Sequence, residues 1–223
     1  MSSARLPLFP LGTVLLPGAR LPLRLFEARY LELARDLEGV AESERLIGVV
    51  WIRRGNEVGA GAAASLAEVG CVARVDAMAR DSSTGRPTVH LVGTGTHRFH
   101  LDGIDEAAGT AYAMGEVTWL GEASDEGGPP IGEVVERALR SLAEYRRAVG
   151  AETARIEAVP GHLAYRIAEQ ALLPFGDQQD VLAAGSERAR LHLLTRMLRR
   201  ETGFVRQFRA LPHLETPGGA GLN

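Results

Sequence analysis

Histidine and cysteine have the widest chemistry among the residue types of this sequence, since they bind metals, transfer protons or act as nucleophiles. The chain has six histidines and a single cysteine, Cys71. His97 and His100 are close in sequence, but their odd spacing on a strand would place the two side chains on opposite faces. His90 could add one ligand, whereas zinc takes three or four. We therefore expect ordinary strand histidines and no metal site.

Cys71 lies in the alternating stretch EVGCVARVDAMAR (68–80), where we expect a small buried thiol rather than a nucleophile. All 25 basic residues are arginine, and lysine is absent. This excludes the lysine of a P-loop, a Schiff-base lysine and a Ser–Lys dyad. Gly93 and Gly95 lack the third glycine of a dinucleotide-binding motif, so we expect a tight turn there. The sequence predicts no catalytic residue and no cofactor.

The charge balance is nearly neutral, with 28 acidic residues and a formal net charge of −3. Nucleic-acid binders usually have a strongly basic face. Nucleic acid is therefore not the expected partner, although a local arginine patch is compatible with this total. The paired arginines at 53–54, 146–147 and 199–200 are predicted to be solvated, with a site for phosphate or an acidic partner as the alternative.

Four prolines interrupt the apolar stretch LPLFPLGTVLLPGARLPLRLFEARY (6–30). A membrane helix needs about 20 consecutive apolar residues, and an export signal needs an unbroken apolar run, so we expect a cytoplasmic protein. The pieces LPLF, TVLL and RLPLRLF have strand length. In the last piece Leu21, Leu23 and Leu25 alternate with Pro22, Arg24 and Phe26, which is typical of a half-buried strand.

The elements that would position these residues change in kind near residue 120. The first part predicts a helix over 27–39 with Tyr30, Leu33, Ala34 and Leu37 on one face. It also predicts strands at 45–52, 68–80 and 111–120, a turn at 81–87, and two strands within 87–104 that are broken near Gly93 and Gly95. This pattern of short strands favours a compact barrel-like sheet.

From residue 121 the pattern becomes helical. Apolar stripes include Val134, Ala138 and Leu142, then Leu163, Ile167 and Ala171, then Leu191, Leu194 and Leu198, with a shorter helix expected over 177–184. We predict an α+β protein with four segments: a barrel with one helix over 1–120, a Gly/Pro/acidic linker over 121–132, a helical bundle over 133–209 and a disordered tail over 210–223.

The stretch 6–30 resembles the start of the Lon protease N-terminal domain family, of the form PLFPL…LPG…LPLRIFEPRY. LVGTGTHRF, AYAMGEVTWL and LLPFGDQQDVLAAGSERARLHLLTRMLRRE are similar to later family motifs, so the resemblance reaches about residue 201. Ala28 stands where the family often has proline. The resemblance implies a PUA-like β-barrel followed by a helical bundle. It also implies a substrate-binding role in a stand-alone member without ATPase or peptidase domains.

The resemblance implies a non-enzymatic module that binds unfolded polypeptide or a protein partner, related to proteolysis and quality control. A small-molecule sensor or an unrecognised enzyme in the barrel pocket is one alternative, and a nucleic-acid-binding PUA-like protein is another. A groove between barrel and bundle would suit such binding. Aromatic side chains dominate interface energetics, and the candidate anchors are Trp51, Phe99, Trp119, Tyr165 and Phe175.

The two tryptophans are expected mainly in the core, whereas Phe99 and Phe175 are the better candidates for exposed anchors. In the segment FEARY, Phe26 and Tyr30 are expected to point inward, and Glu27 and Arg29 to form an ion pair or a helix cap. We expect this segment to be structural.

Overall fold

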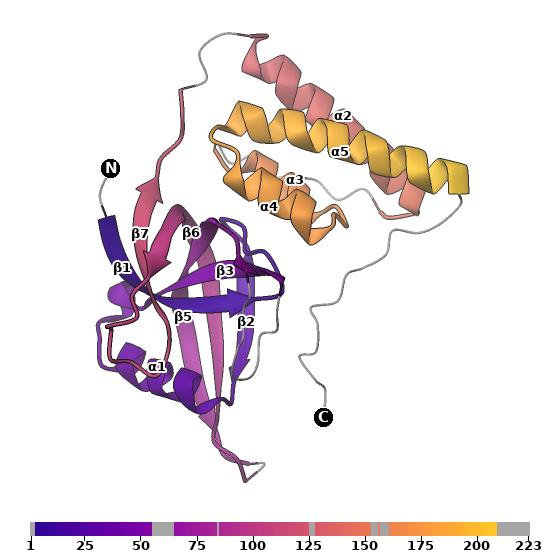
Figure 1. The fold of residues 1–223 in the computed structure, drawn as a ribbon. Coiled ribbons are helices and arrows are strands. Elements are labelled where there is room, and N and C mark those ends of the chain that lie inside the picture. Colours follow the sequence, from indigo (N-terminus) through magenta and orange to yellow (C-terminus); the bar gives the residue numbers. More distant parts are fainter. Residues whose placement is uncertain are drawn as a thin grey trace. The chain divides into compact units, whose positions relative to one another are not determined.

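The computed structural model describes residues 3–54, 65–83, 85–124, 128–152, 156 and 161–208 (Figure 1). These residues form two compact units, one that ends at Leu120 and a second that begins at Gly121. The first unit holds seven strands and one α-helix, and the second holds four α-helices. The α+β class, with the sheet first and the helices after it, is confirmed.

The first unit contains all the strands of the described structure. They are β1 (Ser3–Leu11), β2 (Arg20–Leu25), β3 (Leu46–Arg54), β4 (Ser65–Leu66), β5 (Val69–Asp81), β6 (Thr88–Ile104) and β7 (Met114–Leu120), with helix α1 (Ala28–Glu38) between β2 and β3. The strands predicted at 45–52, 68–80 and 111–120 are thus confirmed with small changes at their ends. The Gly/Ala-rich residues 55–64 lie outside the described part.

Two local predictions are wrong. Residues 13–16, expected as a strand, form a loop in which Val14, Leu15 and Leu16 are nevertheless buried. The region 88–104 is one long strand that continues through Gly93 and Gly95, where we expected a turn. Gly93 pairs with both β5 and β2, and Gly95 pairs with β5 and bonds to Gly18 and Ala19 on its other side, which is why the backbone stays extended.

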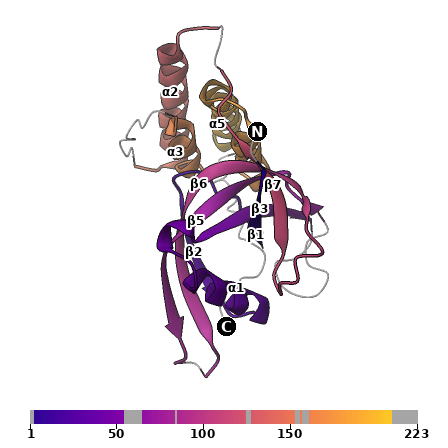
Figure 2. The same ribbon diagram turned by 90° about the vertical axis from the view of Figure 1, so that its left-hand side faces the viewer.

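Five strands close into a barrel in the order β1–β7–β6–β5–β3, and β3 then pairs with β1 (Figure 2). β1 closes the barrel because its two halves pair with different strands. Ser3–Pro7 pairs antiparallel with β7, and Leu8–Leu11 pairs in parallel with β3. β2 adds to the first half of β6, and β4 adds to the end of β3. Full closure removes exposed edges from the five barrel strands.

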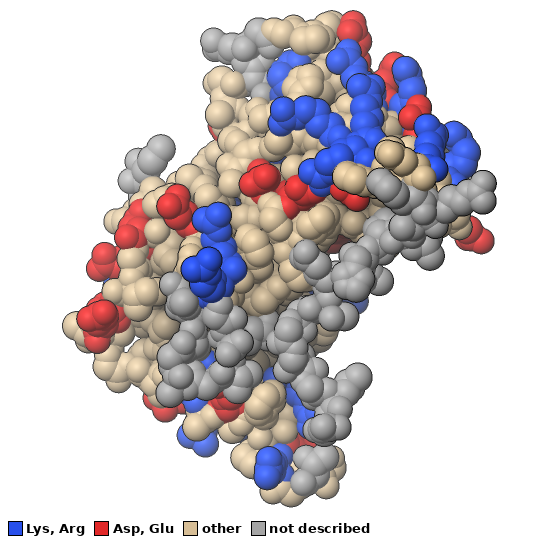
Figure 3. All heavy atoms as spheres, turned by 45° about the vertical axis from the view of Figure 1, so that its right-hand side comes forward, with Lys and Arg blue, Asp and Glu red and all other residues tan. Residues whose placement is uncertain are grey.

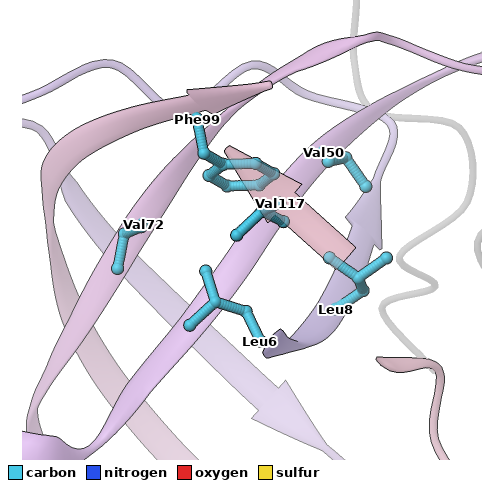
Figure 4. Packing of buried hydrophobic residues seen from close by; sticks show 6 residues of the cluster. All are labelled: Leu6, Leu8, Val50, Val72, Phe99 and Val117. Atoms are coloured by element: carbon cyan, nitrogen blue, oxygen red, sulfur yellow. The ribbon is translucent and has the colours of Figure 1, made fainter. Parts of the chain in front are cut away.

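Side chains that alternate along the barrel strands fill its interior. The six residues of this cluster point toward one another in Figure 4: Leu6, Leu8, Val50, Val72, Phe99 and Val117. Burying an apolar side chain of this size contributes about 1.5–3 kcal/mol. Ala4, Leu66, Leu101 and Trp119 pack against the same cluster and remain partly exposed.

Helix α1 packs one face against the barrel unit. Its buried residues are Tyr30, Leu33, Ala34 and Leu37, as the helical spacing predicted. The ring of Tyr30 stacks on Phe9 of β1 with 4.2 Å between centroids. α1 is therefore anchored to the N-terminal strand by an aromatic pair.

The second unit consists of α2 (Ile131–Val149), α3 (Leu163–Glu169), α4 (Phe175–Ala183) and α5 (Glu187–Phe208). α2 and α5 are the two long helices and pack against each other (Figure 1). Leu191, Leu194 and Leu198 of α5 are buried, as their spacing predicted. None of the described helices is long and apolar enough to cross a membrane. The predicted tail, 210–223, lies outside the described residues.

Candidate functional site

The structure contradicts the expectation that Phe99 is an exposed anchor. Its side chain is 0% exposed and lies at the centre of the barrel cluster (Figure 4). Across the sheet Phe99 pairs with Gly70 on one side and with Trp119 on the other. The sequence showed an aromatic residue on a strand, but the side of the sheet on which its ring lies depends on barrel closure.

Tyr165 is buried too, with 2% of the residue exposed. The guanidinium carbon of Arg190 lies 4.7 Å from the centre of its ring, within the helical unit. The ring of His162 is tilted against it at 6.2 Å. Tyr165 therefore contributes to the core of the helical unit and does not present its ring to a ligand.

The other three candidate anchors are partly exposed. Trp51 lies on β3 opposite Leu11 of β1, and Trp119 lies near the end of β7 against the barrel core. Phe175 is the first residue of α4. These side chains have both the apolar area and the access that a contact surface requires.

Phe26 is the largest departure from the sequence expectations. It was expected to point inward, but 57% of the residue is exposed. The alternation in β2 supplied the missing signal, because Leu21 and Leu25 are buried while Pro22 and Arg24 are exposed. The residue after Leu25 continues that alternation and faces solvent.

The rest of the segment FEARY is held by contacts of its own, directly before and within α1. Arg29 donates from Nε to Oε2 of Glu27 at 3.1 Å, which confirms the expected ion pair. The Arg29 guanidinium also lies 4.5 Å from the centre of the Tyr30 ring. Tyr30 also stacks on Phe9, so the residues directly after Phe26 are anchored to the barrel unit.

Two motifs that are far apart in the sequence meet on the barrel. The Gly18 N–H donates to the Gly95 carbonyl at 2.8 Å, and the Gly95 N–H donates to the Ala19 carbonyl at 2.9 Å. A Cβ atom at position 95 would lie 2.3 Å from the Leu16 carbonyl oxygen. Gly95 is thus required by the close approach of the Leu16–Gly18 loop.

A buried cation organises the helical unit. Arg190 is 0% exposed and forms ion pairs with Glu122 and Glu187, and its Nη1 donates to the Ala184 carbonyl at 3.1 Å. Burial alone would lower its pKa, but the hydrogen bond to Glu122 and the negative neighbours raise that pKa instead. The guanidinium therefore stays charged in the core.

Residues of the predicted linker contact this same network. The Ala123 N–H donates to the Gly185 carbonyl at 2.8 Å, and Arg188 donates to the Pro129 carbonyl at 2.6 Å. Together with Glu122, these contacts fasten the described part of segment 121–130 to the helical unit. The composition of the segment suggested a loose connection and gave no sign of these bonds.

Three titratable groups of the barrel unit are either buried or hydrogen-bonded. Cys71 is 0% exposed, as expected, and burial raises the pKa of its thiol from 9.0 to about 12. His100 contacts Asp102 at 2.9 Å, and Thr118 donates to the same carboxylate at 2.7 Å. Within the described residues, no group of three or more His, Cys, Asp or Glu side chains is arranged to hold a metal ion.

Comparison with known proteins gives one consistent family. The family model described as "ATP-dependent protease La (LON) substrate-binding domain" matches residues 5–200. The chain is 30% identical to the Lon protease of Anaeromyxobacter dehalogenans (strain 2CP-C) over 203 residues, which are 89% of this chain and 23% of that protein. It is 29% identical to Lon protease 2 of Myxococcus xanthus over 201 residues, which are 88% of this chain and 24% of that protein. The chain therefore spans about a quarter of the length of these relatives.

Two solved structures share the fold. A Lon N-terminal domain protein from Xanthomonas campestris has a TM-score of 0.57 and 26% identity, and the match covers 94% of this chain and 99% of that one. The N-terminal domain of a Mycobacterium avium complex Lon protease has a TM-score of 0.65 and 17% identity, and the match covers 88% of this chain and 98% of that one.

Proposed function

This chain belongs to the Lon substrate-binding domain family, and on that premise we propose that it is a non-enzymatic module that binds polypeptide. The ligand is either an unfolded segment or a partner protein, and the role belongs to protein quality control. The family match over residues 5–200 carries the proposal, because it includes both units of the chain.

Phe26 is the first anchor that we propose for this binding. It is an exposed aromatic residue between β2 and α1, and aromatic side chains contribute most to interface energetics. Trp51, Trp119 and Phe175 are proposed as further contacts, since each is partly exposed.

Binding through these residues would be mainly apolar. Burial of apolar area contributes about 25 cal/mol per Å² and is not screened by salt. The affinity for a neutral unfolded peptide is therefore expected to change little with ionic strength. Truncation of one central aromatic anchor costs about 2 kcal/mol, which is about a 30-fold rise in Kd.

The test is fluorescence anisotropy with a labelled, uncharged unfolded-protein peptide at two salt concentrations. Phe26→Ala is expected to weaken binding about 30-fold while the melting temperature stays close to that of the parent protein. Ile104→Ala is the matched control, because Ile104 is also an exposed apolar residue of the barrel unit, at 45%.

Three results would count against the proposal. Absence of binding at high protein concentration would remove the polypeptide-binding function itself. Loss of binding in moderate salt would contradict an apolar contact. Equal losses in Phe26→Ala and Ile104→Ala would show that the Phe26 position is not the anchor.

A further inference from the structure

The solvent face of α5 concentrates positive charge. Six of its residues are arginines and only two are glutamates, Glu187 and Glu201. One side of α5 is apolar and buried, and it includes Leu194, Leu198 and Val205. Arg196, Arg199 and Arg206 lie on the opposite, exposed side of the helix. We refer to these three residues as the α5 arginine face.

The other three arginines of α5 already have hydrogen-bond or ion-pair partners. Arg190 is paired with Glu122 and Glu187, Arg200 is paired with Asp177 and Glu201, and Arg188 donates to the Pro129 carbonyl. In the part of the chain that the structure describes, the side chains of the three residues of the α5 arginine face form no ion pair or hydrogen bond.

Unpaired cations on one helix face repel one another and destabilise the helix, since residues three or four apart are neighbours. Figure 3 shows blue arginine side chains gathered on the helical unit. In a chain whose net charge is −3, this local excess of positive charge is a property of one surface and not of the whole molecule.

The dimensions of the face suit a short acidic segment. At 1.5 Å per residue, Arg196 and Arg206 are about 15 Å apart along the helix axis. An extended polypeptide covers that length in about five residues at roughly 3.3 Å each. Guanidinium groups bind carboxylates with two parallel hydrogen bonds, so arginine is well suited to this ligand.

We propose that the α5 arginine face binds short acidic segments of extended polypeptide. The proposal rests on the proposed polypeptide binding but uses a different surface from Phe26, with a different physical basis. Acidic polypeptide is favoured over nucleic acid because three free charges fit a short ligand, whereas a chain with net negative charge repels a long polyanion.

The experiment measures the binding of three labelled probes by fluorescence anisotropy: a peptide in which glutamates alternate with serine and leucine, the same peptide with glutamine in place of glutamate, and a single-stranded oligonucleotide. The variant is the triple substitution Arg196→Gln, Arg199→Gln and Arg206→Gln. Glutamine is a good helix former, so α5 is expected to remain folded, and circular dichroism checks this.

The control variant removes three exposed arginines from the barrel unit by Arg35→Gln, Arg53→Gln and Arg54→Gln, and so has the same net charge. We expect the acidic peptide to lose about tenfold in affinity with the α5 variant and less than about twofold with the control. Its binding by the parent protein is expected to weaken with salt, whereas that of the glutamine peptide is not.

Equal losses in the two triple variants would overturn the proposal, since they would report net charge alone. If the parent protein bound the acidic and glutamine peptides equally, the α5 assignment would fail while polypeptide binding survived. If neither peptide bound, the proposed function would fail as well. Tighter binding of the oligonucleotide, lost in the α5 variant, would reassign the face to nucleic acid.

Discussion

The ring of Phe99 occupies the space that a side chain at Gly70 would need. A Cβ atom built at position 70 would lie 2.3 Å from Cζ of Phe99 and 2.6 Å from the Val49 carbonyl oxygen. Gly48 lies on the neighbouring strand, and a Cβ atom there would lie 3.1 Å from the same ring atom. The barrel interior thus combines one large ring with strand glycines that make room for it.

Gly70→Ala is therefore expected to destabilise the barrel unit, because both the ring and a backbone carbonyl would have to move. Overpacking of this kind costs about 1–3 kcal/mol, and urea unfolding measures it. Gly103→Ala is the matched control, since a Cβ atom at that strand glycine would have no atom within 4 Å. A Gly70→Ala protein as stable as the Gly103→Ala protein would disprove the packing argument.

Phe99→Ala and Phe26→Ala should separate stability from binding. Loss of the fully buried ring at position 99 is expected to reduce the free energy of unfolding by about 3–5 kcal/mol. Loss of the exposed ring at position 26 should change it by less than about 0.5 kcal/mol. Thermal melts of the two proteins, compared with the parent, decide between these expectations. A large loss of stability in Phe26→Ala would mean that this ring is part of the core.

Arg190→Ala is expected to cost about 3–5 kcal/mol, because it leaves the partly buried Glu187 without its cation and creates a cavity beside Tyr165. Arg200→Ala removes a cation from a pair with Asp177 on the surface and should cost less than about 1 kcal/mol. Denaturant unfolding of both variants measures the difference. Equal costs would show that the burial of Arg190 does not determine its contribution.

From the burial of Cys71 we predict how the stability of the protein depends on pH in the alkaline range. Burial raises its pKa from 9.0 to about 12, so the native state keeps its proton while an unfolded chain loses it above about pH 9. The stability from this group is fully present below pH 9.0 and is lost as the pH rises toward 12. Cys71→Ala should remove this part of the pH dependence in unfolding experiments.

The same burial predicts the reactivity of Cys71. The thiolate is the nucleophile, and access is needed for reaction. A thiol reagent should therefore modify Cys71 only as fast as the barrel unfolds, and denaturant should accelerate the reaction to that of a free thiol. Rapid modification of the folded protein would contradict the closed barrel around this strand.

The periodicity of apolar residues predicted the helices and strands well, but it predicted the exposure of single side chains less well. The helix at 27–39 and the strand at 45–52 were found because apolar spacing is a local property of the sequence. Phe99 and Tyr165 were placed wrongly because their burial depends on contacts with residues far away in the chain, such as Gly70 and Arg190. Phe26 could have been placed correctly from the alternation of β2.

The closure of the barrel could not be predicted from local sequence patterns for the same reason. The pairing of β1 with both β7 and β3 joins segments that share no sequence signal. The continuation of β6 through Gly93 and Gly95 also depends on partners on two sides. Glycine suggested a turn, but the close approach of Leu16 to Gly95 explains why an extended backbone has glycine there.

The division of β1 between β7 and β3 sets the order of events during synthesis. Ser3 pairs with Thr118, so the first strand of the barrel to leave the ribosome cannot complete its hydrogen bonds until the last strand of the barrel has emerged. At about 5–20 residues per second, that wait is on the order of ten seconds. During it, Leu6 and Leu8 have no finished core to enter, and such exposed strands are prone to aggregate. The nascent barrel is therefore itself a candidate for chaperone assistance until β7 is made.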